Sequence, residues 1–172
     1  MALHSEGNGD GRYRMSEKVL ETPFMNGKIY AVCVGKKRSA PKERVKAGFI
    51  RAGHGLDGDA HVDSGRRQIS LLAWERVVAV NGEANLGAVP GDFAENITTT
   101  GIDWSAATVD SLIEIGTVKL RIVERGKPEH GPGDYSFHGV ALLAKEGIFA
   151  EVLESGYVVE GDATDVRLGD KK

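Results

Sequence analysis

Short apolar runs separated by glycine-rich turns make up most of the chain from residue 27 onward. The run 29–34 is apolar and rich in β-branched residues, which predicts a strand buried on both faces. The second half of the run 112–123 alternates apolar with charged residues, which is typical of a strand that buries one face. Gly116 interrupts this run, so we expect a hairpin that turns there.

Most of the remaining chain follows the same pattern. Further strands are predicted at 48–50, 67–72, 93–99, 157–159 and 166–168. Two segments favour short helices, 73–80 ending near Asn81 and 148–153 ending at Gly156. Many short strands with few helices predict a mainly β fold, a closed or nearly closed β-barrel with a few short helices.

The apolar pattern also predicts the domain organisation. Residues 1–26 are polar and glycine-rich and lack periodicity, so we expect a mobile N-terminal arm before one domain at 27–169. No apolar run is long enough to cross a bilayer, and the first residues lack the apolar segment of a signal peptide. Cys33 is the single cysteine, which excludes an internal disulfide and favours a reducing, cytoplasmic location.

Charge is unevenly distributed along the chain. The net charge is -3, yet residues 28–51 contain eight basic residues and one acid. Two interpretations stand, a solvated lysine-rich loop and a surface that attracts an anionic ligand. The stretch matches no nucleic-acid motif, so we expect no nucleic-acid partner, and we expect no membrane partner either.

Four motifs, in this order, resemble the MOSC family, which is named for the C-terminal domain of molybdenum cofactor sulfurases. The motifs are GLDGDAH at 55–61, RQISLL at 67–72, PGDFAENI at 90–97 and KEGIFA at 145–150, followed by Gly161-Asp162. This resemblance spans residues 27–168 and implies a β-barrel associated with the molybdenum cofactor (molybdopterin). At family level it also implies binding of molybdenum ion and of pyridoxal phosphate.

The resemblance further implies partners, either a molybdoenzyme or a cysteine desulfurase. A chain of 172 residues has no room for a pyridoxal-phosphate desulfurase domain beside the barrel, so any sulfur donor is expected to be a separate protein. In the family, the loop corresponding to 126–129 normally ends in a cysteine that presents sulfur or contacts molybdenum, but here Glu129 takes that place. A carboxylate is a hard ligand and forms no persulfide, so sulfur relay by the usual route is not expected. Cys33 is a poor replacement, because a thiol within an apolar strand has a raised pKa and little access.

Two candidate catalytic residues follow from these segments. Glu129, next to His130, is a candidate general acid or base. His61 is the other, because Asp57, Asp59 and His61 are spaced by two and would share one side of an extended backbone. That set suits acid–base chemistry or a divalent ion, although aspartates in glycine-rich turns often bond only to nearby backbone N–H groups. We assign no metal site.

Basic residues supply the candidate cofactor contacts. Arg67, helped by Lys42 and Lys127, is predicted to grip the phosphate that the molybdenum cofactor carries on its pterin. The alternative is that Arg66 or Arg67 is a surface ion-pair partner.

Polar residues in apolar surroundings complete the candidate set. Asp59 and Asn96 are predicted to contact the cofactor, and Glu95 is predicted to be structural, because buried polar groups need partners. His138, like other loop histidines, is expected to be exposed.

The sequence therefore favours a molybdenum-cofactor-related module that binds an anionic pterin and acts in its carriage, delivery or maturation. Two alternatives stay open. One is a molybdenum-dependent sulfurtransferase- or reductase-like enzyme, and the other is a non-catalytic protein-interaction domain.

Overall fold

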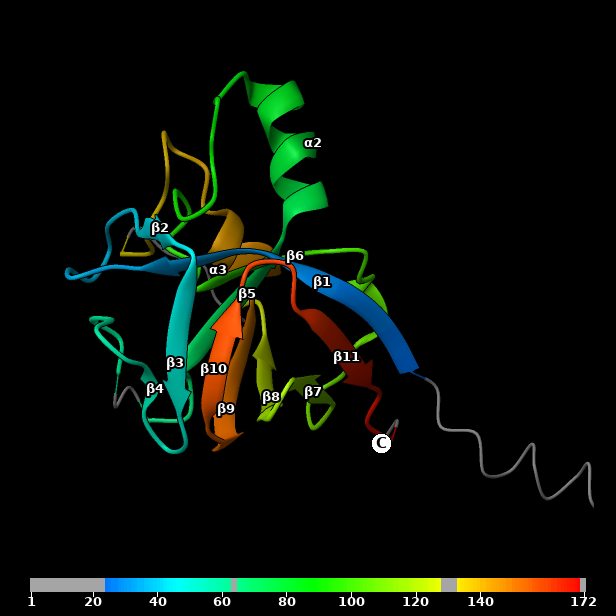
Figure 1. Cartoon of the computed structure of the whole chain (residues 1–172). Helices are drawn as coiled ribbons and strands as arrows, with labels where there is room; N and C mark the ends of the chain where they lie inside the picture. The colour runs from blue at the N-terminus through cyan, green and yellow to red at the C-terminus, as the bar shows by residue number, and fades with distance from the viewer. Residues whose placement is uncertain (1–23, 63–64, 128–132, 171–172) are drawn as a thin grey trace, which may run out of the picture.

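The computed structural model describes residues 24–62, 65–127 and 133–170, and most of its regular structure is β (Figure 1). The elements are β1 (Phe24–Val34), β2 (Glu43–Val45), β3 (Ala47–Arg51), β4 (Gly55–Leu56), β5 (Ile69–Ala73), α2 (Trp74–Ala84), β6 (Ile97–Thr100), the 3-10 helix η1 (Trp104–Ala106), β7 (Leu112–Ile115), β8 (Val118–Arg125), α3 (Leu142–Glu146), β9 (Ile148–Glu154), β10 (Gly156–Val159) and β11 (Ala163–Arg167). The predicted mainly β fold is confirmed. Among the described residues, no helix is both long and apolar enough to cross a membrane.

Seven strands close into a barrel, in the order β11-β7-β8-β9-β5-β6-β1, and β1 pairs again with β11 to complete the ring. The closing pair is antiparallel and sets Met25 opposite Val166, so the first and last described strands lie side by side (Figure 1). β2 extends the sheet beyond β1, and β10, β3 and β4 form a separate three-stranded sheet. The predicted barrel is therefore present and closed.

Side chains of alternate residues fill the barrel. In β8, Val118, Leu120 and Ile122 are buried, while the residues between them are partly exposed. In β5, Ile69 and Leu71 belong to the same core. The intervening side chains of the strands therefore point to the outer surface.

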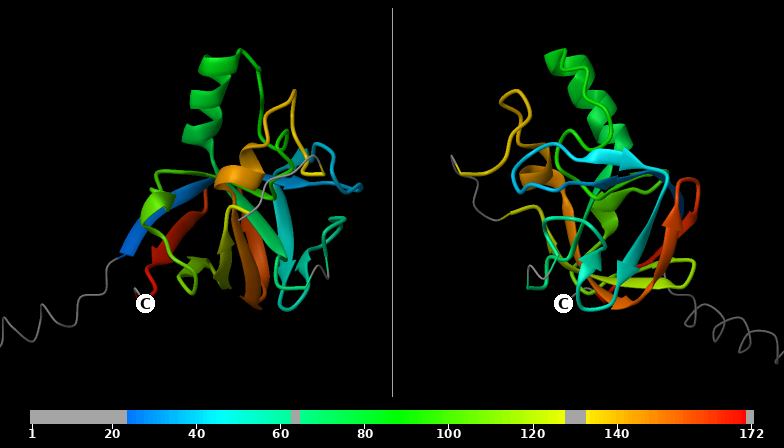
Figure 2. Two further views of the ribbon diagram at one scale, coloured as in Figure 1. Left: turned by 180° about the vertical axis from the view of Figure 1, so that it is seen from behind. Right: turned by 60° about the vertical axis from the view of Figure 1, so that its left-hand side comes forward.

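A second, smaller core lies on that outer surface. Its buried members are Leu72, Val77, Val80, Ala88, Phe93 and Leu142. They pack α2, α3 and the segment before β6 against the outside of the barrel, and α2 projects from one end of it (Figures 1 and 2). This cluster supports one wall of the pocket described below.

One predicted helix is wrong. Residues 148–153 form β9, which pairs with both β5 and β8. Ile148, Ala150 and Val152 belong to the barrel core, while Phe149 and Glu151 alternate with them. Alanine, glutamate and leucine favour a helix locally, but strand pairing and burial of every second side chain stabilise the extended conformation instead. The helix of this region is α3, which lies just before β9 in the chain.

Other boundaries shift for local reasons. β1 begins at Phe24, three residues before the expected start of the domain, and the rest of the predicted arm lies outside the described residues. The predicted strand 93–99 is only partly right, because positive φ angles at Gly91 (92°) and Ala94 (70°) turn the chain before β6. α2 continues past Asn81 to Ala84 and ends at Asn85, whose φ of 53° is left-handed.

Candidate functional site

A pocket of about 320 Å³ opens on the outer face of the barrel, and we call it the outer pocket. Ser70 of β5 and Phe149 of β9 contribute to it from positions that alternate with core residues. Its lining residues are Arg38, Ser39, His61, Arg67, Ser70, Phe93, Ala94, Asn96, Lys127, Gly133, Tyr135, Leu143, Ala144 and Phe149. The pocket thus combines segments that are far apart in the sequence.

Four of the residues singled out in the sequence meet in this pocket, namely His61, Arg67, Asn96 and Lys127. Each comes from a different segment, so only the fold brings them together. Of the other candidates, Lys42 and Asp59 do not line the pocket. Glu129 lies outside the described residues, as does His130.

Two cationic side chains of the outer pocket, Arg67 and Lys127, are held in place by acids. The Arg67 guanidinium donates from Nε (2.8 Å) and Nη2 (2.7 Å) to the two carboxylate oxygens of Glu124. It also lies 5.4 Å from the ring centroid of Phe149, a cation–π contact. Lys127 Nζ lies 2.7 Å from Asp134 Oδ1. Arg67 therefore forms an ion pair and also lines the pocket, and its contact with a phosphate stays a prediction.

The neighbouring Arg66 lies apart from this site. It pairs with Glu151 (3.2 Å) and is not a lining residue of the outer pocket. Two adjacent arginines with different surroundings provide a matched pair for experiments.

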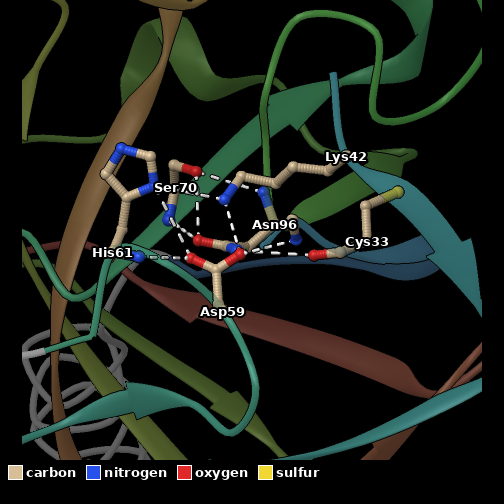
Figure 3. Close-up of polar contacts among 7 residues, drawn as sticks. Cys33, Lys42, Asp59, His61, Ser70 and Asn96 are labelled. Atoms are coloured by element: carbon tan, nitrogen blue, oxygen red, sulfur yellow. Dashed lines mark hydrogen bonds and ion pairs between the residues drawn. The ribbon is translucent and has the colours of Figure 1, made fainter. Parts of the chain in front are cut away.

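A buried ion pair contacts the pocket-lining imidazole (Figure 3). Lys42 Nζ lies 2.5 Å from Asp59 Oδ1, and only 1% of either side chain is exposed. The same Nζ lies 3.2 Å from Nδ1 of His61. Lys42, predicted as a cofactor ligand, is therefore placed to act on the pocket through His61.

Hydrogen bonds keep Asp59 ionised in spite of its burial. Burial alone would raise the pKa of its carboxyl, but hydrogen bonds from His61, Lys42 and the backbone N–H of Gly35 outweigh burial and lower the pKa well below its usual range. Asp57 does not join this group, because it pairs with Arg51 on the surface (2.8 Å). Among the described residues, no cluster of three or more histidine, cysteine or acidic side chains is placed to hold a metal ion.

Asn96 is held rigidly at the pocket. Its Oδ1 accepts hydrogen bonds from the backbone N–H (3.0 Å) and the hydroxyl (3.2 Å) of Ser70, and its Nδ2 donates to the carbonyl of Cys33 (3.4 Å; Figure 3). These bonds join β5, β1 and the segment before β6. Asn96 therefore has both a structural role and a place in the pocket lining.

Two buried groups next to this network do not line the pocket. Cys33 is fully buried, and its thiol pKa is raised to about 12, mainly by burial and then by the nearby Glu95. Glu95 Oε1 accepts from Gly91 N (2.7 Å) and from the Thr98 hydroxyl (2.9 Å), and burial raises the pKa of its carboxyl. Burial and the raised pKa favour the protonated thiol of Cys33, and Glu95 is bonded through Oε1 while its buried Oε2 has no hydrogen-bond partner among the described residues.

Several residues of the pocket were not singled out from the sequence. Phe93, Phe149 and Tyr135 line it, and their apolar or aromatic character gives no signal that separates a pocket wall from a core. Arg38 belongs to the basic stretch 28–51, so the expectation of an anion-attracting surface applies to it. Gly91 is needed near the pocket, since a Cβ there would lie 2.2 Å from the carbonyl oxygen of Lys42.

Comparison with known proteins identifies relatives of this architecture. A sequence model of the MOSC domain matches residues 51–165. The crystal structure of the YUAD protein from Bacillus subtilis superposes with a TM-score of 0.71 at 18% identity, covering 87% of this chain and 100% of that chain. YiiM from Escherichia coli gives 0.61 at 19% identity, with coverage of 86% and 71%, and YiiM from Geobacillus stearothermophilus gives 0.62 at 18%, with coverage of 86% and 76%. At these identities the likeness shows a shared fold, and no curated protein sequence matches the chain.

Proposed function

Since the chain belongs to the MOSC domain family, we propose that its outer pocket binds the anionic pterin of the molybdenum cofactor and that the protein acts in carriage, delivery or maturation of that cofactor. The partner would be a molybdoenzyme that receives the cofactor, or a cysteine desulfurase that supplies sulfur. The cytoplasm, where reduced thiols persist, would be the compartment.

The observation that carries this proposal is the position of Arg67. Its guanidinium lies over the ring of Phe149 and faces a pocket that Lys127 and Arg38 also line. Cationic groups beside aromatic walls suit a ligand that has both a flat ring system and a phosphate. A volume of about 320 Å³ is at the lower end of the range found for small-ligand sites.

The side chains present fit the organic part of the cofactor. Arg67 and Lys127 would hold the phosphate, Phe93 and Phe149 would pack against the pterin, and Asn96 would fix its orientation. Glu124 and Asp134 hold the two cations in place before binding, which lowers the entropic cost of arranging them around an anion.

Among the described residues, those that line the pocket include no thiol, so they offer no soft ligand to molybdenum. The one cysteine of the chain is buried and its thiol pKa is raised, so we do not expect Cys33 to carry a persulfide. When bound, the cofactor itself would supply any redox chemistry. This chain's own residues bind the pterin, orient it and present His61 to it. The shortage of protein nucleophiles favours carriage or delivery over a protein-based sulfur transfer.

The test is the molybdenum content, by mass spectrometry, and the oxidised-pterin fluorescence of protein purified from a cofactor-producing host. A Glu129→Cys variant is measured in parallel. Both signals near one per native chain would support the proposal, and turnover of a substrate by that loaded protein would favour the enzyme alternative. Signals in the variant alone would contradict binding by the native chain. Signals in neither protein would favour a non-catalytic interaction domain.

A further inference from the structure

A second cavity lies at one end of the barrel, and we call it the barrel-end cleft. It has a volume of about 750 Å³ and forms where β5, β6 and β8 end and β9 begins. Its lining residues are Ala73, Glu75, Arg76, Gly101, Ile102, Asp103, Trp104, Ser105, Arg125, Gly126, Lys145, Glu146 and Ile148. Barrel mouths are common places for small-molecule sites.

The floor of the cleft is apolar. Ala73, Ile102, Trp104 and Ile148 all belong to the barrel core and still reach the cleft. The indole N–H of Trp104 donates to the hydroxyl of Thr99 (2.9 Å), which fixes the ring. A fixed indole beside aliphatic side chains is a suitable surface for a flat apolar ligand.

The acids on the rim are all engaged by groups of the protein. Glu146 accepts both donors of Arg76 (2.9 and 3.3 Å), and Asp103 accepts from the backbone N–H (3.0 Å) and hydroxyl (2.5 Å) of Ser105. Glu75 accepts from the backbone N–H of Gly101 (3.3 Å). Their negative charges are therefore partly compensated before any ligand arrives.

Two rim cations are not compensated in this way. Arg125 at the end of β8 and Lys145 in α3 are exposed, and neither side chain makes an ion pair or hydrogen bond within the part of the chain that the structure describes. Glu75 and Asp103 accept only from neutral donors, so the formal charges of the rim balance. Arg125 and Lys145 are nevertheless the rim cations that no acid of the described residues engages, which leaves both available to an anionic ligand.

The barrel-end cleft is separate from the outer pocket. Gly126 N donates to Gly147 O (2.7 Å) and Lys127 N donates to Ala144 O (2.7 Å), so the segment after β8 is fastened to α3. Gly126 and Lys145 line the cleft, whereas Lys127 and Ala144 line the pocket. The two sites are back to back across this wall.

We propose that the barrel-end cleft binds a small aromatic or heteroaromatic anion that carries a carboxylate or phosphate group. Its ring packs against Trp104 on the apolar floor, and Arg125 and Lys145 hold its charge. This site does not depend on the function of the outer pocket.

The test follows the indole N–H signal of Trp104 by NMR during titration with phenyl phosphate, benzoate and the neutral benzyl alcohol. The chain has two tryptophans, so a Trp74→Phe variant identifies the Trp104 signal. We expect saturable shifts with at least one of the two anions and a dissociation constant for benzyl alcohol about tenfold higher or more. Equal binding of the neutral compound, or no saturation with either anion, would overturn the proposal.

Three variants locate the binding. The double change Arg125→Gln and Lys145→Gln should raise the dissociation constant about tenfold, because it removes both charge partners. The matched change Lys46→Gln and Arg167→Gln removes the same charge elsewhere on the surface and should leave it unchanged. Arg67→Gln in the outer pocket should also leave it unchanged. Weaker binding of the anion by Arg67→Gln, or equally weaker binding by both double variants, would contradict a site in the cleft.

Discussion

Lys42 Nζ lies 3.2 Å from His61 Nδ1 while it also pairs with Asp59, so a buried ammonium group contacts the imidazole that lines the outer pocket. A lysine ammonium only donates hydrogen bonds. We therefore predict that Nδ1 of His61 accepts from this ammonium group and that the ring hydrogen lies on Nε2. In this arrangement the hydrogen bond that Asp59 accepts from His61 comes from the backbone N–H (3.0 Å), and the imidazole offers a donor with its other nitrogen.

This tautomer can be measured directly in the native protein. Long-range ¹H–¹⁵N NMR of the imidazoles should show His61 with an unprotonated Nδ1 and a protonated Nε2. A His61→Gln variant identifies its signals among those of the five histidines. A protonated Nδ1 in the neutral ring would contradict the hydrogen bond from Lys42.

The Lys42–Asp59 pair should contribute strongly to stability. Lys42→Met leaves the Asp59 carboxylate buried without a cation, which should lower the free energy of unfolding by about 3–5 kcal/mol. Arg44→Met is the comparison, because it removes an exposed partner of Glu160 and should cost at most about 1 kcal/mol. Urea denaturation measures both.

A double variant distinguishes the cost of one unpaired buried charge from the cost of losing the whole Lys42–Asp59 pair. Lys42→Met with Asp59→Leu removes both charges and should recover much of the lost stability. A cost for Lys42→Met no larger than that for Arg44→Met would show that the pair does not stabilise the fold.

Glu95 should make stability depend on pH. Burial raises the pKa of its carboxyl above the ordinary 4.5, against which hydrogen bonds from Gly91 and Thr98 act only in part. The folded chain therefore keeps a proton that the unfolded chain releases. The stabilisation from this proton is full below about pH 4.5 and is lost as pH rises toward the folded pKa.

The variant Glu95→Gln cannot ionise. The difference between its free energy of unfolding and that of the native protein should increase in favour of the variant as pH rises above 4.5. The increase should be up to about 1.4 kcal/mol per pH unit until the pKa of Glu95 in the folded protein is reached. Urea denaturation at pH 5 and pH 8 measures the gain, and Glu83→Gln on the exposed side of α2 is the control. The same difference from the native protein at both pH values would mean that Glu95 is ionised in the fold.

The sequence predicts the local parts of this fold better than the long-range parts. The hairpin at Gly116 follows from alternation within one segment, and Gly116 turns the chain with a positive φ of 58°. The closure of β1 on β11 joins the two ends of the domain, and no local pattern encodes it. β9 was predicted as a helix because its residue types favour one, whereas two neighbouring strands impose the extended form.

The same limit applies to the candidate site. Resemblance and charge select Arg67, Asn96, Lys127 and His61, and the fold does place them around one pocket. Phe149 was not selected, because a pocket wall and a core are made of the same residue types. Whether Lys42 faces a ligand or a buried acid depends on a contact between distant segments, which spacing cannot show.

Cys33 should be inert in the folded protein. Its side chain is fully buried, and burial raises the thiol pKa to about 12, so very little thiolate exists at pH 8. A thiol reagent such as dithionitrobenzoate should react at a rate set by unfolding, and quickly once urea is added. Fast reaction in native buffer would contradict this prediction and make Cys33 a candidate sulfur carrier.

The most direct test of pterin binding in the outer pocket is the affinity of a phosphorylated pterin for the Arg67→Gln and Arg66→Gln variants, measured by isothermal titration calorimetry. The two changes remove the same charge from adjacent positions, but only Arg67 lines the outer pocket. We expect Arg67→Gln to weaken binding about tenfold or more, with little change in melting temperature, and Arg66→Gln to bind like the native protein. Equal affinities for the two variants would contradict the assignment of the outer pocket as the pterin site.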